Sequence, residues 1–354
     1  MTPEPTESQA TAAEIASLKR LAAGIIRAQG NRFVKDLLRS KGIRIGTNKD
    51  EFEANLNHAI ESSHLRIDDV RAWLADVEGW GNQHVYLYKL TPSVSSQLTE
   101  RKIHRRVAAA GLEGVWDGET ALAFPDEPTL TSISFTDSVF RLVWQESSPN
   151  WTPEPEKNYT KQEGLDLYEY RAFRQVERRA ITRFEAHVQE GLAGLFIADP
   201  IQGTEHQNAI NEAKRVIALL FDLGAMERGL VNISTVSKNL DQRNVPSNNT
   251  ASDQVKTQRS RLASGGAYVE FAANSRDKAY WEEPAIQDVR KSVRSQQLLA
   301  FQGIDGVFIF QQTEGGLSRP LRVQLYGKEN RIRLWASMDA GEVWTILSKL
   351  SEYE

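Results

Sequence analysis

The sequence predicts an α+β protein, in which an all-helical N-terminal module is followed by a mostly antiparallel sheet domain with packed helices. Two patterns carry this prediction. In residues 11–78, apolar residues recur every three or four positions, as they do in amphipathic helices. From residue 129 onward, short alternating runs separated by turn residues predict hairpins, and longer helical patterns lie between them. The length of 354 residues, with 40% hydrophobic and 25% charged residues, fits a globular chain of two or three domains, or one large α+β domain with an appendage.

The helical module is predicted to span residues 11–80. Residues 1–10 are expected to be a disordered tail, because they hold prolines and acids and no periodic apolar positions. Thr11 and Glu14 form a capping box, in which each side chain reaches the backbone amide of the other, and they open a helix that runs to about Ala28.

Three further helices follow in this module. The second covers residues 32–41 and ends at Gly42, because glycine tolerates the left-handed conformation that closes a helix. The third starts within residues 47–50, and Asp68 is expected to cap a short fourth helix.

The α+β domain is predicted to span residues 81–354. Its expected strands are 84–90, 129–135, 139–145, 165–174, 177–188, 194–198, 267–272, 306–311, 320–326 and 331–336. Its expected helices are 98–110, 204–223, 231–240, 284–299 and 340–350. The run 177–188 also fits a helix, but its alternation and the following Gly191 turn favour a strand.

Two segments are predicted to be irregular. Residues 148–164 read as a polar, proline-rich loop. Residues 241–266 are rich in Asn, Ser, Thr, Gln and Arg, and they are expected to be mobile and to mark a possible division within the domain.

Composition excludes several classes of protein. The chain has no cysteine, which excludes disulfides, thiolate metal sites and cysteine nucleophiles. Its N-terminus is acidic and polar, unlike a signal peptide, and its apolar runs are too short to span a bilayer. We therefore expect a cytoplasmic protein that does not bind a membrane.

Basic charge is concentrated near the N-terminus. Seven Lys or Arg and one acid, Asp36, lie between Arg27 and Lys49, although the whole chain carries a formal net charge of −4. Such a local excess predicts a contact with nucleic acid. The predicted helix 98–110 has a second basic face, and the candidate residues there are Arg101, Lys102, Arg105 and Arg106.

Residues from about 32 to 58 resemble the SAP family of DNA-binding modules. The matching positions are Leu38, Gly42, Ile43, Gly46, Lys49, Phe52 and Leu56. The resemblance covers about a tenth of the chain. The spacing between the two glycines is one residue shorter than in that family, and the usual loop proline is absent.

The resemblance implies binding to the backbone of duplex DNA. The implied contacts from the loop and the start of the third helix are Lys41, Arg44, Thr47, Asn48 and Lys49. The basic stretch before the loop adds Arg32, Lys35 and Arg39. The alternative interpretation is a short helical hairpin with a solvated basic face.

No catalytic signature is found. The six histidines do not have metal-ligand spacing, and neither a nucleophile elbow nor a phosphate loop is present. No cofactor or metal is predicted. A metal-dependent nuclease would need carboxylates that bind the metal ion. Four acids are candidates by residue type alone: Glu169, Glu177, Glu185 and Asp199. Trp144 and Trp335 are expected in the core, and Trp151 is expected to be exposed for a partner or a base.

The sequence therefore predicts a non-catalytic protein that binds double-stranded nucleic acid with little sequence preference and acts as a subunit or scaffold, with a protein partner or as a homodimer. The first alternative is a protein-interaction subunit of a multi-protein assembly, such as a prokaryotic defence system, without nucleic-acid binding. The second is a metal-dependent nuclease.

Overall fold

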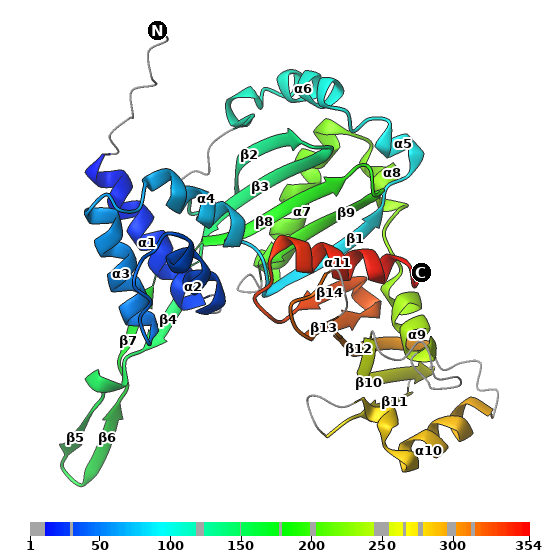
Figure 1. Cartoon of the computed structure of the whole chain (residues 1–354). Helices are drawn as coiled ribbons and strands as arrows, with labels where there is room; N and C mark the ends of the chain where they lie inside the picture. Colours follow the sequence, from blue (N-terminus) through cyan, green and yellow to red (C-terminus); the bar gives the residue numbers. More distant parts are fainter. Residues whose placement is uncertain are drawn as a thin grey trace. The chain divides into compact units, whose positions relative to one another are not determined.

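The computed structural model is an α+β structure whose helices come first and whose sheet follows (Figure 1). It describes residues 11–28, 31–117, 124–148, 150–176, 179–198, 203–243, 255–264, 267–274, 279–295, 302–312 and 316–354. The chain forms two compact units. The first comprises Met1–Glu78, Glu119–Thr129 and Gln145–Ile181, and the second comprises Gly79–Gly118, Leu130–Trp144 and Thr182–Glu354. The predicted tail, residues 1–10, lies outside the described residues.

The first unit contains four helices around one apolar core. They are α1 (Ala12–Ala28), α2 (Asn31–Ser40), α3 (Lys49–Glu61) and α4 (Ile67–Val77). Their core includes the fully buried side chains of Leu18, Leu38, Phe52 and Leu74, which come from all four helices. The helical spacing of these apolar residues is what places them on one side of each helix.

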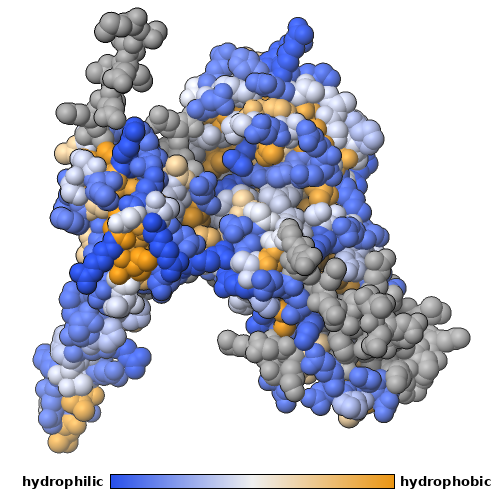
Figure 2. Space-filling view, viewed as in Figure 1, coloured by the Kyte–Doolittle hydropathy of each residue, from blue (hydrophilic) through white to orange (hydrophobic). Residues whose placement is uncertain are grey.

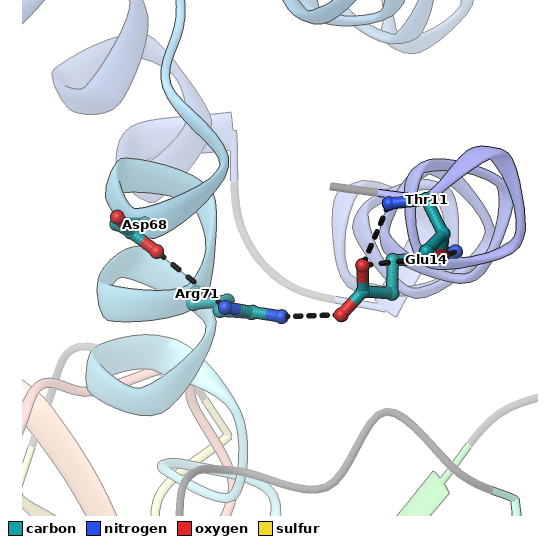
Figure 3. Close-up of polar contacts among 4 residues, drawn as sticks. All are labelled: Thr11, Glu14, Asp68 and Arg71. Carbon is teal, nitrogen blue, oxygen red and sulfur yellow. Dashed lines mark hydrogen bonds and ion pairs between the residues drawn. The ribbon is translucent and has the colours of Figure 1, made fainter. Parts of the chain in front are cut away.

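The predicted capping box at the start of α1 is confirmed. The Thr11 amide donates to the Glu14 carboxylate at 2.8 Å, and the Glu14 amide donates to the Thr11 hydroxyl at 3.2 Å. Arg71 of α4 pairs with Glu14 at 3.1 Å and with Asp68 at 3.5 Å, so that one guanidinium links α4 to the capping box of α1 (Figure 3).

The other helix ends agree with the sequence in two cases and differ in one. Gly42 has φ +65° and follows α2, and Ile43 N–H donates to the Leu38 carbonyl at 2.8 Å, as in a Schellman motif. Asn48 caps α3. The prediction that Asp68 caps α4 is wrong, because Arg66 is the N-cap residue and Asp68 lies in the first turn.

The first unit also contains a long two-stranded arm. The sequence predicted a loop over its first part, residues 148–164. The arm consists of β4 (Asn150–Pro153), η2 (Pro155–Lys157), β5 (Tyr159–Glu163), β6 (Asp166–Tyr170) and β7 (Phe173–Val176). β4 pairs with β7, and β5 pairs with β6. The prediction failed because Pro153 lies at the end of β4 and Pro155 lies in a 3-10 turn, where they interrupt no ladder.

The second unit is built on a ten-stranded sheet with the order β11-β10-β12-β13-β14-β1-β9-β8-β3-β2 (Figure 1). The strands are β1 (Gln83–Lys89), β2 (Thr129–Thr136), β3 (Val139–Ser147), β8 (Arg179–His187), β9 (Leu192–Ala198), β10 (Val255–Ser264), β11 (Ala267–Ala272), β12 (Gln302–Phe310), β13 (Leu321–Tyr326) and β14 (Arg331–Leu334). The pairings from β11 to β8 in this order are antiparallel.

Helices cover parts of both faces of this sheet. The remaining elements are α5 (Pro92–Ser95), α6 (Glu100–Ala109), η1 (Glu113–Val115), α7 (Gly203–Leu220), α8 (Leu223–Glu227), α9 (Ile233–Arg243), η3 (Tyr280–Glu282), α10 (Pro284–Ser295), η4 (Gly327–Glu329) and α11 (Ala340–Ser351). α9 and α11 pack on the face that carries Val85, Phe308 and Val323. α7 packs against β9, and its His206 meets Tyr86 on the opposite face.

The predicted irregular segment 241–266 contains a strand. β10 pairs with β11 on one side and with β12 on the other, and Asp241 is buried and accepts a hydrogen bond from Tyr280 at 2.6 Å. Residues 244–254, 265 and 266 lie outside the described part of the chain. The strand was missed because its polar composition gives no apolar alternation, and β12 lies far along the chain.

No helix in the described part of the chain is long and apolar enough to cross a membrane.

Candidate nucleic-acid interface

One side of α2 carries three of the predicted cations, of which Arg32 and Lys35 are half-buried and Arg39 is exposed and pairs with Asp36 at 3.2 Å. Arg32, Lys35 and Arg39 are three and four positions apart, so they lie on the side opposite the buried Val34, Leu37 and Leu38. The Arg32 guanidinium lies 4.7 Å from the ring centroid of Phe33, and the Lys35 ammonium lies 5.7 Å from that of Phe52. The rings therefore lie beside the charged groups of both side chains, and the two residues are half-buried.

Arg44 lies in the loop that connects α2 to α3. Its neighbours Ile43 and Ile45 pack against the helical core, whereas Arg44 is exposed. The Asn55 side chain donates to the Arg44 carbonyl at 2.9 Å and ties this loop to α3. Arg44 is thereby presented from a fixed backbone beside the α2 face.

The carboxylate of Glu51 accepts hydrogen bonds at the start of α3. Glu51 accepts from the Thr47 amide at 2.8 Å and from the Thr47 hydroxyl at 3.1 Å, and Asn48 accepts from the Glu51 amide at 2.9 Å. The backbone hydrogen bond from Thr47, with smaller contributions that include the charge of Arg44, lowers the pKa of Glu51. Asn48 is therefore the N-cap of α3, and Thr47 hydrogen-bonds to Glu51 in the same turn; the phosphate contacts of Thr47 and Asn48 stay a prediction.

Gly46 makes this cap possible. A Cβ at Gly46 would lie 2.3 Å from Cβ of Glu51, so the carboxylate can fold back only over a glycine. Lys41 is engaged too: its ammonium lies 2.6 Å from Asp69, and this hydrogen bond lowers the pKa of the Asp69 carboxyl. Lys49 is half-buried in the first turn of α3.

The second predicted basic set lies on α6, in the other unit. Arg101 and Arg105 are exposed. Lys102 donates to the Ser96 carbonyl at 2.6 Å, and Arg106 donates to Gln97 at 2.9 Å and to the carbonyl of Leu220 at the end of α7. Arg106 is therefore a packing residue, and α6 offers fewer available cations than its sequence suggested.

Two of the four carboxylates proposed by residue type, Glu169 and Glu185, lie in the described part of the chain. In the described part of the chain, no group of three or more His, Asp or Glu side chains is arranged to hold a metal ion. Glu185 is buried among donors, and Glu169 pairs with Arg171 on the arm. Glu177 and Asp199 lie outside the described residues.

Sequence reasoning missed two surfaces. On the arm, every residue from 155 to 171 is exposed, and Leu165 is completely so at 101%. Figure 2 shows the tip of this arm as an apolar patch. On the sheet, Trp335 is 42% exposed rather than buried in the core as predicted, and Arg333 lies 3.8 Å from its ring centroid. The signal for the second surface was the alternation of arginine with apolar residues in 321–325 and 331–334.

No protein-family model matches this chain, and no curated protein matches it either.

Proposed function

We propose that this chain binds nucleic acid through its phosphate backbone, using Arg32, Lys35, Arg39 and Arg44 of the first unit, and that it carries out no chemistry there. The observation that supports the proposal most is the gathering of these four cations on one side of α2 and on the adjoining loop, where Arg39 and Arg44 are exposed and Arg32 and Lys35 are half-buried. Phosphate contacts fix a protein on nucleic acid without reading its sequence, so little sequence preference is expected.

The experiment is a titration of labelled duplex DNA at low salt, read by fluorescence anisotropy, with the wild-type chain and the variant R32A/R39A/R44A. Removal of three phosphate-binding side chains should weaken binding by about tenfold or more. The matched control is K161A/R171A/R215A, which removes three cations whose side chains are 57%, 68% and 65% exposed. Equal affinities of the two variants would contradict the proposal.

A second candidate function, self-association through the arm, is favoured by the distribution of exposed apolar side chains. Seven of the eleven exposed large hydrophobic residues among the described ones lie on the arm: Trp151, Tyr159, Leu165, Leu167, Tyr168, Tyr170 and Phe173. Apolar surface of this kind is typical of protein contacts. The arm carries four basic and five acidic residues between 150 and 176. Because its net charge is nearly zero, two copies would not repel each other, and the arm would not attract a polyanion such as nucleic acid.

This candidate is tested by sedimentation velocity over a range of protein concentrations. The wild-type chain should sediment as a dimer at high concentration, and L165S/L167S should shift it to the monomer. The matched control is L219S, which changes a 49% exposed leucine on α7. A wild-type chain that stays monomeric throughout would exclude self-association.

A further inference from the structure

The open half of the ten-stranded sheet presents a basic face that lies outside both predicted sets. On β13, Leu321, Val323 and Leu325 are buried in the core beneath α9 and α11, so Arg322 and Gln324 point to the opposite face. Cross-strand partners share a face, and Gln324 is the partner of Arg333 on β14. We call this side of β10, β12, β13 and β14 the open sheet face.

The same register extends the open sheet face to the edge of the sheet. Arg322 is opposite Ile309, and Ile309 is opposite Lys256 on β10. Arg259 and Arg261 are opposite Val307 and Asp305. Among the described α-helices, α9 packs against β10, β12 and β13, and it lies on the other face. On the open sheet face the strand residues Val307 and Ile309 are buried, whereas Trp335 and Tyr268 are exposed.

Positive charge dominates this face. Its strand positions carry six cations, which are Lys256, Arg259, Arg261, Arg322, Arg331 and Arg333. Four acids lie beside these cations: Glu270 and Asp305 are 4.0 and 3.9 Å from Arg259 and Arg261, Glu282 is 3.3 Å from Lys256, and Glu329 pairs with Arg331. Because the whole chain is acidic, this excess is a property of the face, and it is complementary to a polyanion.

Aromatic rings alternate with the arginines. Arg333 lies 3.8 Å and Arg322 lies 5.9 Å from the ring centroid of Trp335, which directly follows β14. At the other edge, Arg261 lies 3.7 Å from the centroid of Tyr268, which is 57% exposed. An exposed indole beside two guanidinium groups offers a flat ring for stacking next to charges for phosphate.

We propose that the open sheet face binds single-stranded nucleic acid, with a base stacked on Trp335 and the flanking phosphates on Arg322 and Arg333. A single strand is the occupant because its bases are free to stack, whereas the bases of a duplex are already stacked on each other. This site is in the second unit and does not depend on the duplex contact proposed for α2.

The test uses three labelled probes in anisotropy titrations: a single-stranded oligothymidylate, an oligouridylate of the same length, and an abasic strand of the same length and charge. The variants are W335A, W335F and, as a matched control, W151A, which changes a 60% exposed tryptophan on the arm. Comparison of thymidylate with uridylate distinguishes DNA from RNA as the source of the strand.

W335A should bind oligothymidylate roughly 5- to 150-fold more weakly than wild type, which is the range for loss of one stacked base. W335F should keep most of the affinity because it keeps a ring, W151A should match the wild type, and the abasic strand should bind as weakly to the wild type as oligothymidylate does to W335A. R322A/R333A should lower both the affinity and the salt dependence. An unchanged affinity of W335A, or equal binding of the abasic and normal strands by the wild type, would overturn the proposal.

The experiments can contradict either of the two proposed binding sites without contradicting the other. R32A/R39A/R44A should weaken duplex binding and leave the effect of W335A on single strands intact. If duplex binding is absent and the Trp335 effect persists, the α2 proposal is wrong and the open sheet face stands.

Discussion

The indole N–H of Trp344 on α11 donates a hydrogen bond of 2.8 Å to the carboxylate of Glu185 on β8. Glu185 is 2% exposed and also accepts from Arg141 at 2.6 Å and from His187 at 2.9 Å. Burial by itself raises the pKa of Glu185, but the hydrogen bond from His187, the charges of Arg141 and Arg183 and the hydrogen bond from Arg141 outweigh it, and the pKa falls to about 2. The buried carboxylate therefore links α11 to the sheet as an anion.

This depressed pKa predicts a stability contribution that depends on pH. It is fully present above the unfolded-state pKa of about 4.3 and is lost as the pH falls toward 2. E185Q should lower the free energy of unfolding by about 3 kcal/mol at pH 7, and its difference from wild type should shrink by about 2 kcal/mol at pH 3. Urea titrations at several pH values measure this. E190Q, which changes an exposed partner of His187, is the control. A constant difference between wild type and E185Q would refute the assignment.

A buried ion pair in the first unit predicts a large effect of a single substitution. The Arg179 side chain is fully buried and donates to both carboxylate oxygens of Glu78 and to Gln145 at 3.0 Å. E78Q leaves the guanidinium without its counter-charge and should cost roughly 3–5 kcal/mol of unfolding free energy. E169Q, in the exposed pair with Arg171, should cost less than about 1 kcal/mol. Similar losses in urea unfolding would contradict this contrast.

The cap of α3 predicts a residue that matters for stability and not for binding. N48A removes the acceptor of the Glu51 amide and should cost about 1 kcal/mol of unfolding free energy. Its affinity for duplex DNA should equal that of the wild type, because Asn48 is used within the fold. A protein of normal stability that binds DNA poorly would show that Asn48 contacts phosphate after all.

Backbone pairing predicts where trypsin cuts first. Lys157, Lys161 and Arg171 lie on the exposed two-stranded arm, whereas Lys256 and Arg259 lie on a strand within the ten-stranded sheet. Local opening of the arm disrupts less buried structure, so cleavage there should precede cleavage in β10. Mass spectrometry of early fragments measures the order, and early cuts after Lys256 or Arg259 would favour the mobile segment that the sequence suggested.

Features that depend on neighbouring residues could be predicted from the sequence. The capping box of Thr11 with Glu14, the end of α2 at Gly42 and the hairpin from β13 to β14 each depend on a few adjacent residues. The fold class followed from such local patterns.

Features that depend on residues far away along the chain could not be predicted from the sequence. β10 is mostly polar and is a strand between β11 and β12, the second of which lies far along the chain. Lys41 appeared available until Asp69, 28 residues away, was found to pair with it. Trp335 was expected in the core from its residue type, but it follows the buried Leu334 of β14 and lies beside Arg333 on the other face.

The central claim is that cations of this chain replace counterions on a nucleic-acid backbone, and the salt dependence of duplex binding by the wild-type chain tests it most directly. Four phosphate contacts from Arg32, Lys35, Arg39 and Arg44 predict that the logarithm of the association constant falls by about 3 to 4 for each tenfold rise in salt. The slope for R32A/R39A/R44A should be shallower by about 0.9 for each phosphate that the variant no longer neutralises. Absence of binding at low salt, or a wild-type affinity that does not change with salt, would contradict the account.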